Sequence, residues 1–151
     1  MAGLFYEQFE LGQKFSHDIR RTVTETDNIL FTTLTHTPAA IHLDAEAAKN
    51  SPYGQVIMNS VFTLGLMVGV SVGDTTLGTT VANLGWDEVR FPKPVFVGDT
   101  LRGETEVMEK RESKSRPETG IVLFKHTAYN QRDELVASCL RSALMYKTPA
   151  G

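Results

Sequence analysis

Apolar residues near the start of the chain alternate with polar ones, and the spacing then changes to one typical of helices. Residues 14–23 carry Phe15, Ile19 and Val23 on one side, which predicts a β-strand. Apolar residues at helical spacing follow this strand, so we expect a helix of about ten residues there. Pro38 then ends the helix, because the residue before a proline avoids the helical conformation.

Polar side chains mark where the first two helices begin. Thr24 and Asp27 stand three residues apart, as they do in a capping box, and predict the start of the first helix. Asp44 has the side chain of an N-cap and predicts a second, short helix over residues 45–49. The chain therefore passes through a helical region before it reaches its centre.

The centre of the chain is a stretch without a single charge, residues 55–73. A membrane-spanning helix needs roughly 20 predominantly apolar residues, so the length alone allows that interpretation. Polar residues such as Thr63 and Ser71 interrupt the stretch, and no basic cluster flanks it to fix an orientation in a membrane. We therefore expect a helix buried in a globular core, beginning at Asn59 or Ser60.

Glycines recur at every fourth position of this central helix, at Gly65, Gly69 and Gly73, and so share one face. In a membrane helix, such a face would pair with a second helix. In a globular protein, the missing side chains would let a curved sheet come close to the helix backbone. We expect the second arrangement.

Four further strands are predicted after the central helix, separated by turns that are polar or rich in proline. In chain order, they cover residues 79–91, 101–107, 120–129 and 135–146. A charged loop, 110–117, follows the second of these strands, and the turn 130–133 joins the last two. One early strand, a helical middle and four later strands predict an α+β fold in which a sheet wraps against one helix.

Length and composition exclude several classes of protein. At 151 residues, with no repeat or linker, the chain is expected to be one domain over 1–151, with its core at about 9–147. A net charge of −3 gives no overall electrostatic footprint for nucleic acid. Four histidines and one cysteine show no zinc-site spacing, so no metal is expected.

The single cysteine and the N-terminal residues indicate the cellular compartment in which the protein is expected. Cys139 cannot form an intramolecular disulfide, and its apolar neighbours predict an inert thiol. The first residues lack a basic stretch followed by an apolar one, so we expect no secretory signal and a cytoplasmic protein. His17 and His126 lie in alternating segments, where surface or hydrogen-bonded structural roles are expected.

Three segments resemble the MaoC-like dehydratase or (R)-specific enoyl-CoA hydratase family: AAIHLDAEAA, VIMNSVFTLGL and FPKPVFVGDTL. The blocks LGWDEVRFPKPVFVGDTL, KRESKSRP and YNQRDELVA are similar to the branch that includes mesaconyl-CoA hydratase and β-methylmalyl-CoA dehydratase. The resemblance implies the hot-dog fold, an antiparallel sheet wrapped around a central helix. It also implies an enzyme that adds or removes water at the C2–C3 bond of a short or branched enoyl-CoA.

The resemblance assigns catalytic roles to three residues. His42 matches the family's histidine and would act as the base, and Ser60 would offer its main-chain N–H to the thioester oxygen. Thr37 stands where the family has an acid, five residues before the histidine. A threonine hydroxyl cannot act as a base near neutral pH, but it can hold a water molecule. His36 would take the acid's place if the loop has shifted by one residue.

Other residues are candidates for binding the substrate. Asn59 would cap the central helix, donate to the thioester carbonyl, or do both. The basic residues that could contact the phosphates of coenzyme A are Arg90, Lys93, Lys110, Arg111, Lys114 and Arg116. Coenzyme A would be part of the substrate, and no separate cofactor is expected.

Two other functions compete with hydration. Loss of the acid fits a non-catalytic acyl-CoA-binding or partner subunit. A hot-dog thioesterase would need a carboxylate on the central helix, and residues 55–73 contain none. Because the family builds its site where two hot-dog units meet and this chain holds one unit, a homodimer or higher homo-oligomer is expected.

Overall fold

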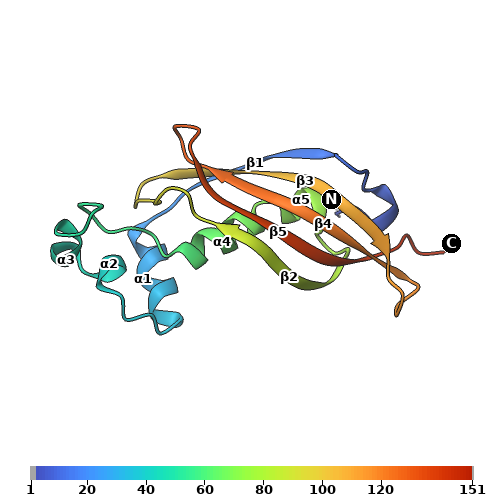
Figure 1. The fold of residues 1–151 in the computed structure, drawn as a ribbon, viewed down its shortest axis with the longest axis horizontal. Helices are drawn as coiled ribbons and strands as arrows, with labels where there is room; N and C mark the ends of the chain where they lie inside the picture. Colours follow the sequence, from blue (N-terminus) through green and yellow to red (C-terminus); the bar gives the residue numbers. More distant parts are fainter. Residues whose placement is uncertain (1–2, 151) are drawn as a thin grey trace.

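Five strands form one antiparallel sheet around a central helix in the computed structural model, which describes residues 3–150 (Figure 1). The strands are β1 (Lys14–Thr22), β2 (Thr80–Arg90), β3 (Thr100–Glu112), β4 (Thr119–Tyr129) and β5 (Leu135–Tyr146). Their order in the sheet is β1-β3-β4-β5-β2, so β1 and β2 form the two edges. This is the hot-dog arrangement, and the predicted α+β fold is confirmed.

The helices lie before β1 and between β1 and β2. They are η1 (Tyr6–Gln8), α1 (Glu25–Leu34), α2 (Ala40–Leu43), α3 (Ala45–Lys49), α4 (Ser60–Gly69) and α5 (Val72–Thr75). Figure 1 shows α1, α2 and α3 gathered beyond one end of the sheet, while α4 runs along the sheet. The short helix α2, which carries the candidate base, has no counterpart in the sequence prediction.

The predicted helix starts are confirmed. Thr24 Oγ1 accepts from the N–H of Asp27 at 3.2 Å, and the Asp27 carboxylate accepts from the N–H of Thr24 at 2.8 Å. The Arg21 guanidinium donates two hydrogen bonds to Asp27 and is the main cause that lowers the pKa of that carboxyl to about 2. Asp44 Oδ1 caps α3 by accepting from the N–H of Ala47 at 3.0 Å.

The central helix is less buried than the sequence predicts. The uncharged stretch divides into α4 and α5, and no helix within residues 3–150 is long and apolar enough to span a membrane. A Cβ atom added at Gly65, Gly69 or Gly73 would meet nothing within 4 Å, so the expectation that the sheet approaches these glycines is wrong. The close approach uses a glycine of the sheet instead, since a Cβ atom at Gly103 would lie 2.7 Å from Cγ2 of Val70.

A polar stripe crosses the sheet from one edge to the other. Its members are Asp74 of α5, His17 of β1, Thr105 of β3, His126 of β4, Arg141 of β5 and Asn83 of β2. Neighbouring members lie 2.8–3.0 Å apart. The stripe separates two apolar clusters, one containing Leu101, Ala128 and Cys139 and the other containing Val107 and Phe124.

Arg141 fixes the direction of every hydrogen bond in the polar stripe. Because a guanidinium can only donate, Nε2 of His126 accepts from Arg141, and Nδ1–H of His126 donates to Thr105. The Thr105 hydroxyl then donates to Nε2 of His17, whose Nδ1–H donates to Asp74. Burial, followed by the charge of Arg141, lowers the pKa of His126 to about 3, so this imidazole is neutral. Both histidines therefore hold structural hydrogen bonds, as expected.

Candidate active site

One buried amide holds the candidate site together. Asn28 lies in α1 with 1% of its surface exposed. Its Nδ2 donates to the carbonyl oxygens of His42 and Ile57, both at 3.0 Å. Its Oδ1 accepts from the N–H of Asn59 at 2.8 Å, immediately before α4 begins. The histidine-bearing helix α2 and the start of α4 are thereby fixed to the same side chain.

His42 has one ring nitrogen engaged and one available. Its Nδ1–H donates to the carbonyl oxygen of Ile57 at 2.8 Å, because a carbonyl can only accept. This hydrogen bond selects the tautomer in which Nε2 carries the lone pair. Nε2 has no hydrogen-bond partner in the described part of the chain, so the half-buried ring can accept a proton there.

The first turn of α4 presents free main-chain donors. Asn59 caps the helix, with its Oδ1 accepting from the N–H of Val61 at 3.0 Å. The Asn59 amide nitrogen turns inward and donates to Thr32 at 3.4 Å. The N–H of Ser60 has no acceptor within residues 3–150, and Ser60 is exposed. An unpaired N–H at a helix N-terminus favours negative charge, as an oxyanion donor must.

A cavity of about 390 Å³ adjoins this helix start. It is lined mainly by apolar residues from the segment before α4, the proline-rich bend and β5, with Ser60 and Thr63 contributed by α4. Because α4 begins at the cavity, a ligand seated there can reach the N–H of Ser60. An apolar pocket with a few polar groups at one side suits an acyl chain whose carbonyl needs a donor.

Sequence and structure comparisons agree on the family. The MaoC-like domain model matches residues 7–130. The chain belongs to this family. It is 34% identical over 97% of its length to mesaconyl-CoA hydratase of Cereibacter sphaeroides, and 32% identical over 96% to β-methylmalyl-CoA dehydratase of Chloroflexus aurantiacus. The chain spans 42% and 41% of the lengths of these two relatives.

A solved structure of similar length shows the same fold. The MaoC-like dehydratase of Rhodospirillum rubrum superposes with a TM-score of 0.85 at 28% identity. The match covers 98% of this chain and 100% of that one.

Thr37, which the resemblance matches to the family's acid, cannot ionise near neutral pH. Thr37 is half-buried, and its hydroxyl lies 3.1 Å from that of Thr35. Within residues 3–150, the one contact between a histidine ring and a carboxylate is that of His17 with Asp74, so His42 has no carboxylate partner. The described residues also contain no group of three or more histidine, cysteine or acidic side chains arranged to hold a metal.

His36 has a conformational role that the sequence did not reveal. Its φ of 52° is left-handed, and the N–H of the next residue, Thr37, reaches back to the carbonyl of Thr32 at 3.0 Å. This is the geometry that commonly ends a helix. α1 therefore ends through the left-handed His36, two positions before the proline that the sequence suggested as the cause. The His36 side chain is exposed, and its use in place of the acid stays a prediction.

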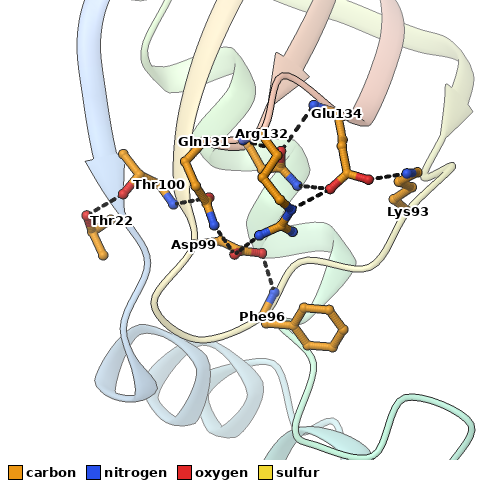
Figure 2. Close-up of polar contacts among 9 residues, drawn as sticks. Thr22, Lys93, Phe96, Asp99, Thr100, Gln131, Arg132 and Glu134 are labelled. Carbon is orange, nitrogen blue, oxygen red and sulfur yellow. Dashed lines mark hydrogen bonds and ion pairs between the residues drawn. The ribbon is translucent and has the colours of Figure 1, made fainter.

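Lys93 is the one candidate phosphate ligand that lines the cavity. Its ammonium pairs with Glu134, and this contact, followed by those from Asn130 and Arg132, lowers the pKa of Glu134 to about 2. Figure 2 shows the surrounding network, which continues from Arg132 and Gln131 to Asp99. The loop that carries Lys93 is thereby attached to the turn between β4 and β5.

The other basic candidates do not line the cavity. Arg111 is near the end of β3, and Lys114 and Arg116 lie in the hairpin that joins β3 to β4. Figure 1 places that hairpin at the end of the sheet opposite α1, α2 and α3. Lys110 donates to the carbonyl oxygens of Tyr6 and Phe9 at 2.9 and 2.7 Å, which is a structural role. Arg90 is exposed and donates to the adjacent carbonyl of Val89.

Sequence reasoning missed Asn28 and Thr32, the buried polar residues of α1. Their spacing of four places them on one helix face, and that pairing of polar residues was the available signal. The apolar residues beside them drew attention instead, although Ile29, Leu30 and Leu34 are exposed.

Proposed function

We propose that this protein adds water to, or removes it from, the C2–C3 bond of a short or branched enoyl-CoA thioester. The observation that carries the proposal is made at the Asn28 amide. It donates to the carbonyl of His42 and accepts from the N–H of Asn59, and so holds the two segments next to each other. A ring nitrogen that can take a proton is thereby fixed beside a helix start that can hold an oxyanion. The names of the two similar enzymes support the same reaction.

In the proposed reaction, His42 moves one proton. Its Nε2 takes a proton from water while the water oxygen bonds to C3, and the electrons of the C2–C3 double bond shift toward the thioester oxygen. The N–H of Ser60 stabilises the negative charge that develops on this oxygen. The His42 imidazolium then returns the proton to C2. Dehydration is the reverse sequence.

Because Thr37 stands in place of the acid, we expect this enzyme to turn over more slowly than relatives that have the acid. A missing general acid or base typically lowers the rate about 10²–10⁴-fold, which leaves measurable turnover. Thr37 contributes by holding the water through its hydroxyl. The same substitution supports the second candidate function, a non-catalytic subunit that binds acyl-CoA without converting it. A thioesterase ranks last, because no carboxylate lies on α4.

Coenzyme A enters as part of the substrate. Lys93, on the cavity wall, is the best-placed partner for a phosphate of coenzyme A. Arg111, Lys114 and Arg116 could reach a ligand in this cavity only from a neighbouring copy, because they lie at the other end of the sheet. The cavity volume of about 390 Å³ favours a short acyl chain.

The functional unit that we propose is a homodimer. β2 is an edge strand of eleven residues, and Leu84 and Trp86 on it are exposed. Unpaired edges and exposed apolar residues favour pairing with another chain. Further exposed apolar residues lie on α1 and at the start of α4: Ile29, Leu30, Leu34 and Val61. A second copy could cover both surfaces.

The test is hydration of a panel of enoyl-CoA thioesters that includes crotonyl-CoA and mesaconyl-CoA, followed by loss of enoyl absorbance. We expect turnover by the wild-type protein and a loss of about 10²–10⁴-fold in His42→Ala. Lys49→Ala, which changes an exposed residue of α3, is the control and should retain full activity.

Absence of turnover across the whole panel would contradict the hydratase proposal. If CoA thioesters then raised the melting temperature without being converted, the non-catalytic binding function would replace it. Equal activity in His42→Ala and wild type would contradict the role of the histidine alone.

A further inference from the structure

A second polar group of α4 lines the candidate cavity. Thr63 follows Ser60 by three residues, so the two share a helix face, and both line the cavity. Thr63 is 2% exposed. The lining around it is mainly apolar, with Met58, Val95 and Val136 among its members. A hydroxyl in such a place either has an internal partner or serves a ligand.

Within residues 3–150, no hydrogen bond involves the Thr63 hydroxyl, and it is not among the fully enclosed side-chain atoms without a partner, which are Thr79 Oγ1 and Arg141 Nη2, so it keeps contact with open space. Other helical threonines of this protein behave differently. Thr33 and Thr75 each donate their hydroxyl to the carbonyl four residues earlier, at Ile29 and Ser71. Thr63 makes no such bond to Asn59, although its backbone is equally helical. Its hydroxyl is therefore free to bind a molecule in the cavity.

We propose that Thr63 binds the oxygen at C3 of the acyl group, which is the attacking water in hydration and the hydroxyl in the hydrated product. The inference rests on the proposed function, because it takes the thioester oxygen to lie at the N–H of Ser60. Thr63 lies about 4.5 Å further along the helix axis than Ser60, at 1.5 Å per residue. The C3 oxygen is displaced from the thioester oxygen by a comparable length of acyl chain.

In this assignment, Thr63 takes over one role of the acid in relatives, which is to orient the oxygen at C3. The hydroxyl can accept from the water and donate to the C3 hydroxyl, so it orients this oxygen without being ionised. His42 remains the group that moves the proton. A site that hydrogen-bonds a substrate hydroxyl discriminates against analogues without it, so Thr63 would favour 3-hydroxyacyl over saturated acyl groups.

The experiment compares the binding of two ligands by calorimetry, 3-hydroxybutyryl-CoA and butyryl-CoA, which differ only in the C3 hydroxyl. Binding is measured in the His42→Ala protein, so that no turnover intervenes. Thr63→Val keeps the side-chain shape and removes the hydroxyl. We expect it to weaken 3-hydroxybutyryl-CoA about tenfold and to leave butyryl-CoA unchanged.

Two further variants separate this role from a structural one. Thr63→Ser keeps a hydroxyl and should restore the preference for the 3-hydroxy ligand. Thr75→Val removes a buried hydroxyl that is bonded within its own helix, and should leave the preference unchanged. In the active protein, Thr63→Val should lower kcat for hydration with little change in KM.

The possible outcomes distinguish the two proposals. If Thr63→Val weakens both ligands equally, or neither, the assignment of Thr63 is wrong while the hydratase proposal stands. If neither CoA thioester binds to the protein with Thr63 intact, the proposed function itself is wrong, and the assignment of Thr63 falls with it.

Discussion

Single residues with several hydrogen bonds decide the geometry of the candidate site. Asn28 satisfies two carbonyl oxygens and one N–H from segments that lie far apart in the sequence. His42 depends on the same segments, since its Nδ1–H donates to the Ile57 carbonyl that Asn28 also binds. The position of His42, the proposed base, relative to α4 is therefore set by one amide from α1.

Asn28→Ala should destabilise the protein and reduce its activity together. Each buried polar group left without a partner costs about 1–3 kcal/mol, and this substitution removes the partner of the His42 carbonyl and of the Asn59 N–H, while the Ile57 carbonyl keeps its bond from His42. Urea unfolding measures the loss of stability. Asn50→Ala is the matched control, because that amide is exposed and makes one long hydrogen bond of 3.5 Å. Equal stability of the two variants would contradict the role of Asn28.

The residues of the site show where sequence reasoning was limited. His42 and Ser60 were proposed through the family resemblance, and their roles stay predictions, whereas the cap at Asn59 was predicted from its local chemistry and is confirmed. Asn28 could not be found this way, because its partners lie 14, 29 and 31 residues away along the chain. Local patterns report contacts within a few residues, whereas this amide connects three segments in space.

Among the elements, the polar stripe is the clearest departure from a purely apolar core. It connects all five strands through side chains, in addition to the main-chain hydrogen bonds of the sheet. A buried network with fixed donors and acceptors favours one register of the strands over its alternatives. Arg141 is 2% exposed, so its charge depends on these partners.

Stability should fall on acidification because of His126. Its pKa is about 3 in the folded protein and 6.5 as a free side chain, so the unfolded chain binds the proton first. The free energy of unfolding should therefore decrease as the pH falls from 6.5 toward 3. His126→Gln keeps an acceptor for Arg141 and cannot titrate, so its decrease should be shallower. Urea unfolding at several pH values tests this, and identical slopes would contradict it.

The elements themselves were largely predictable, and the faces they bury were not. The capping box at Thr24 and the N-caps at Asp44 and Asn59 depend on neighbouring residues, so their helix starts were predicted correctly. The glycine face of α4 was assigned to the sheet but faces outward. The spacing of residues shows that a helix has different faces. It does not show whether the sheet, another helix or solvent covers each face.

At the scale of the whole molecule, exposed apolar residues favour a second copy of the chain. The single tryptophan, Trp86, lies on the unpaired edge strand β2 and is 43% exposed. If two copies meet at this edge, the tryptophan becomes buried on association. Its fluorescence then reports the oligomeric state directly.

Leu84→Lys should convert the proposed dimer to a monomer, because it places a charge on the edge strand. We expect a smaller mass by light scattering and a red-shifted tryptophan emission. Leu11→Lys changes a leucine that is 67% exposed before β1, and it should leave both readings unchanged. An unchanged mass in Leu84→Lys would show that β2 is not the interface.

We propose that this chain adds water to an enoyl-CoA through His42, although Thr37 stands where the resemblance places the family's acid. Transfer of oxygen from isotopically labelled water to C3 of crotonyl-CoA or mesaconyl-CoA, followed by mass spectrometry, tests it most directly, because label accumulates even when turnover is slow. We predict labelled 3-hydroxyacyl-CoA with the wild-type protein and almost none with His42→Ala. Bound but unlabelled thioester after long incubation with the wild-type protein would contradict the claim.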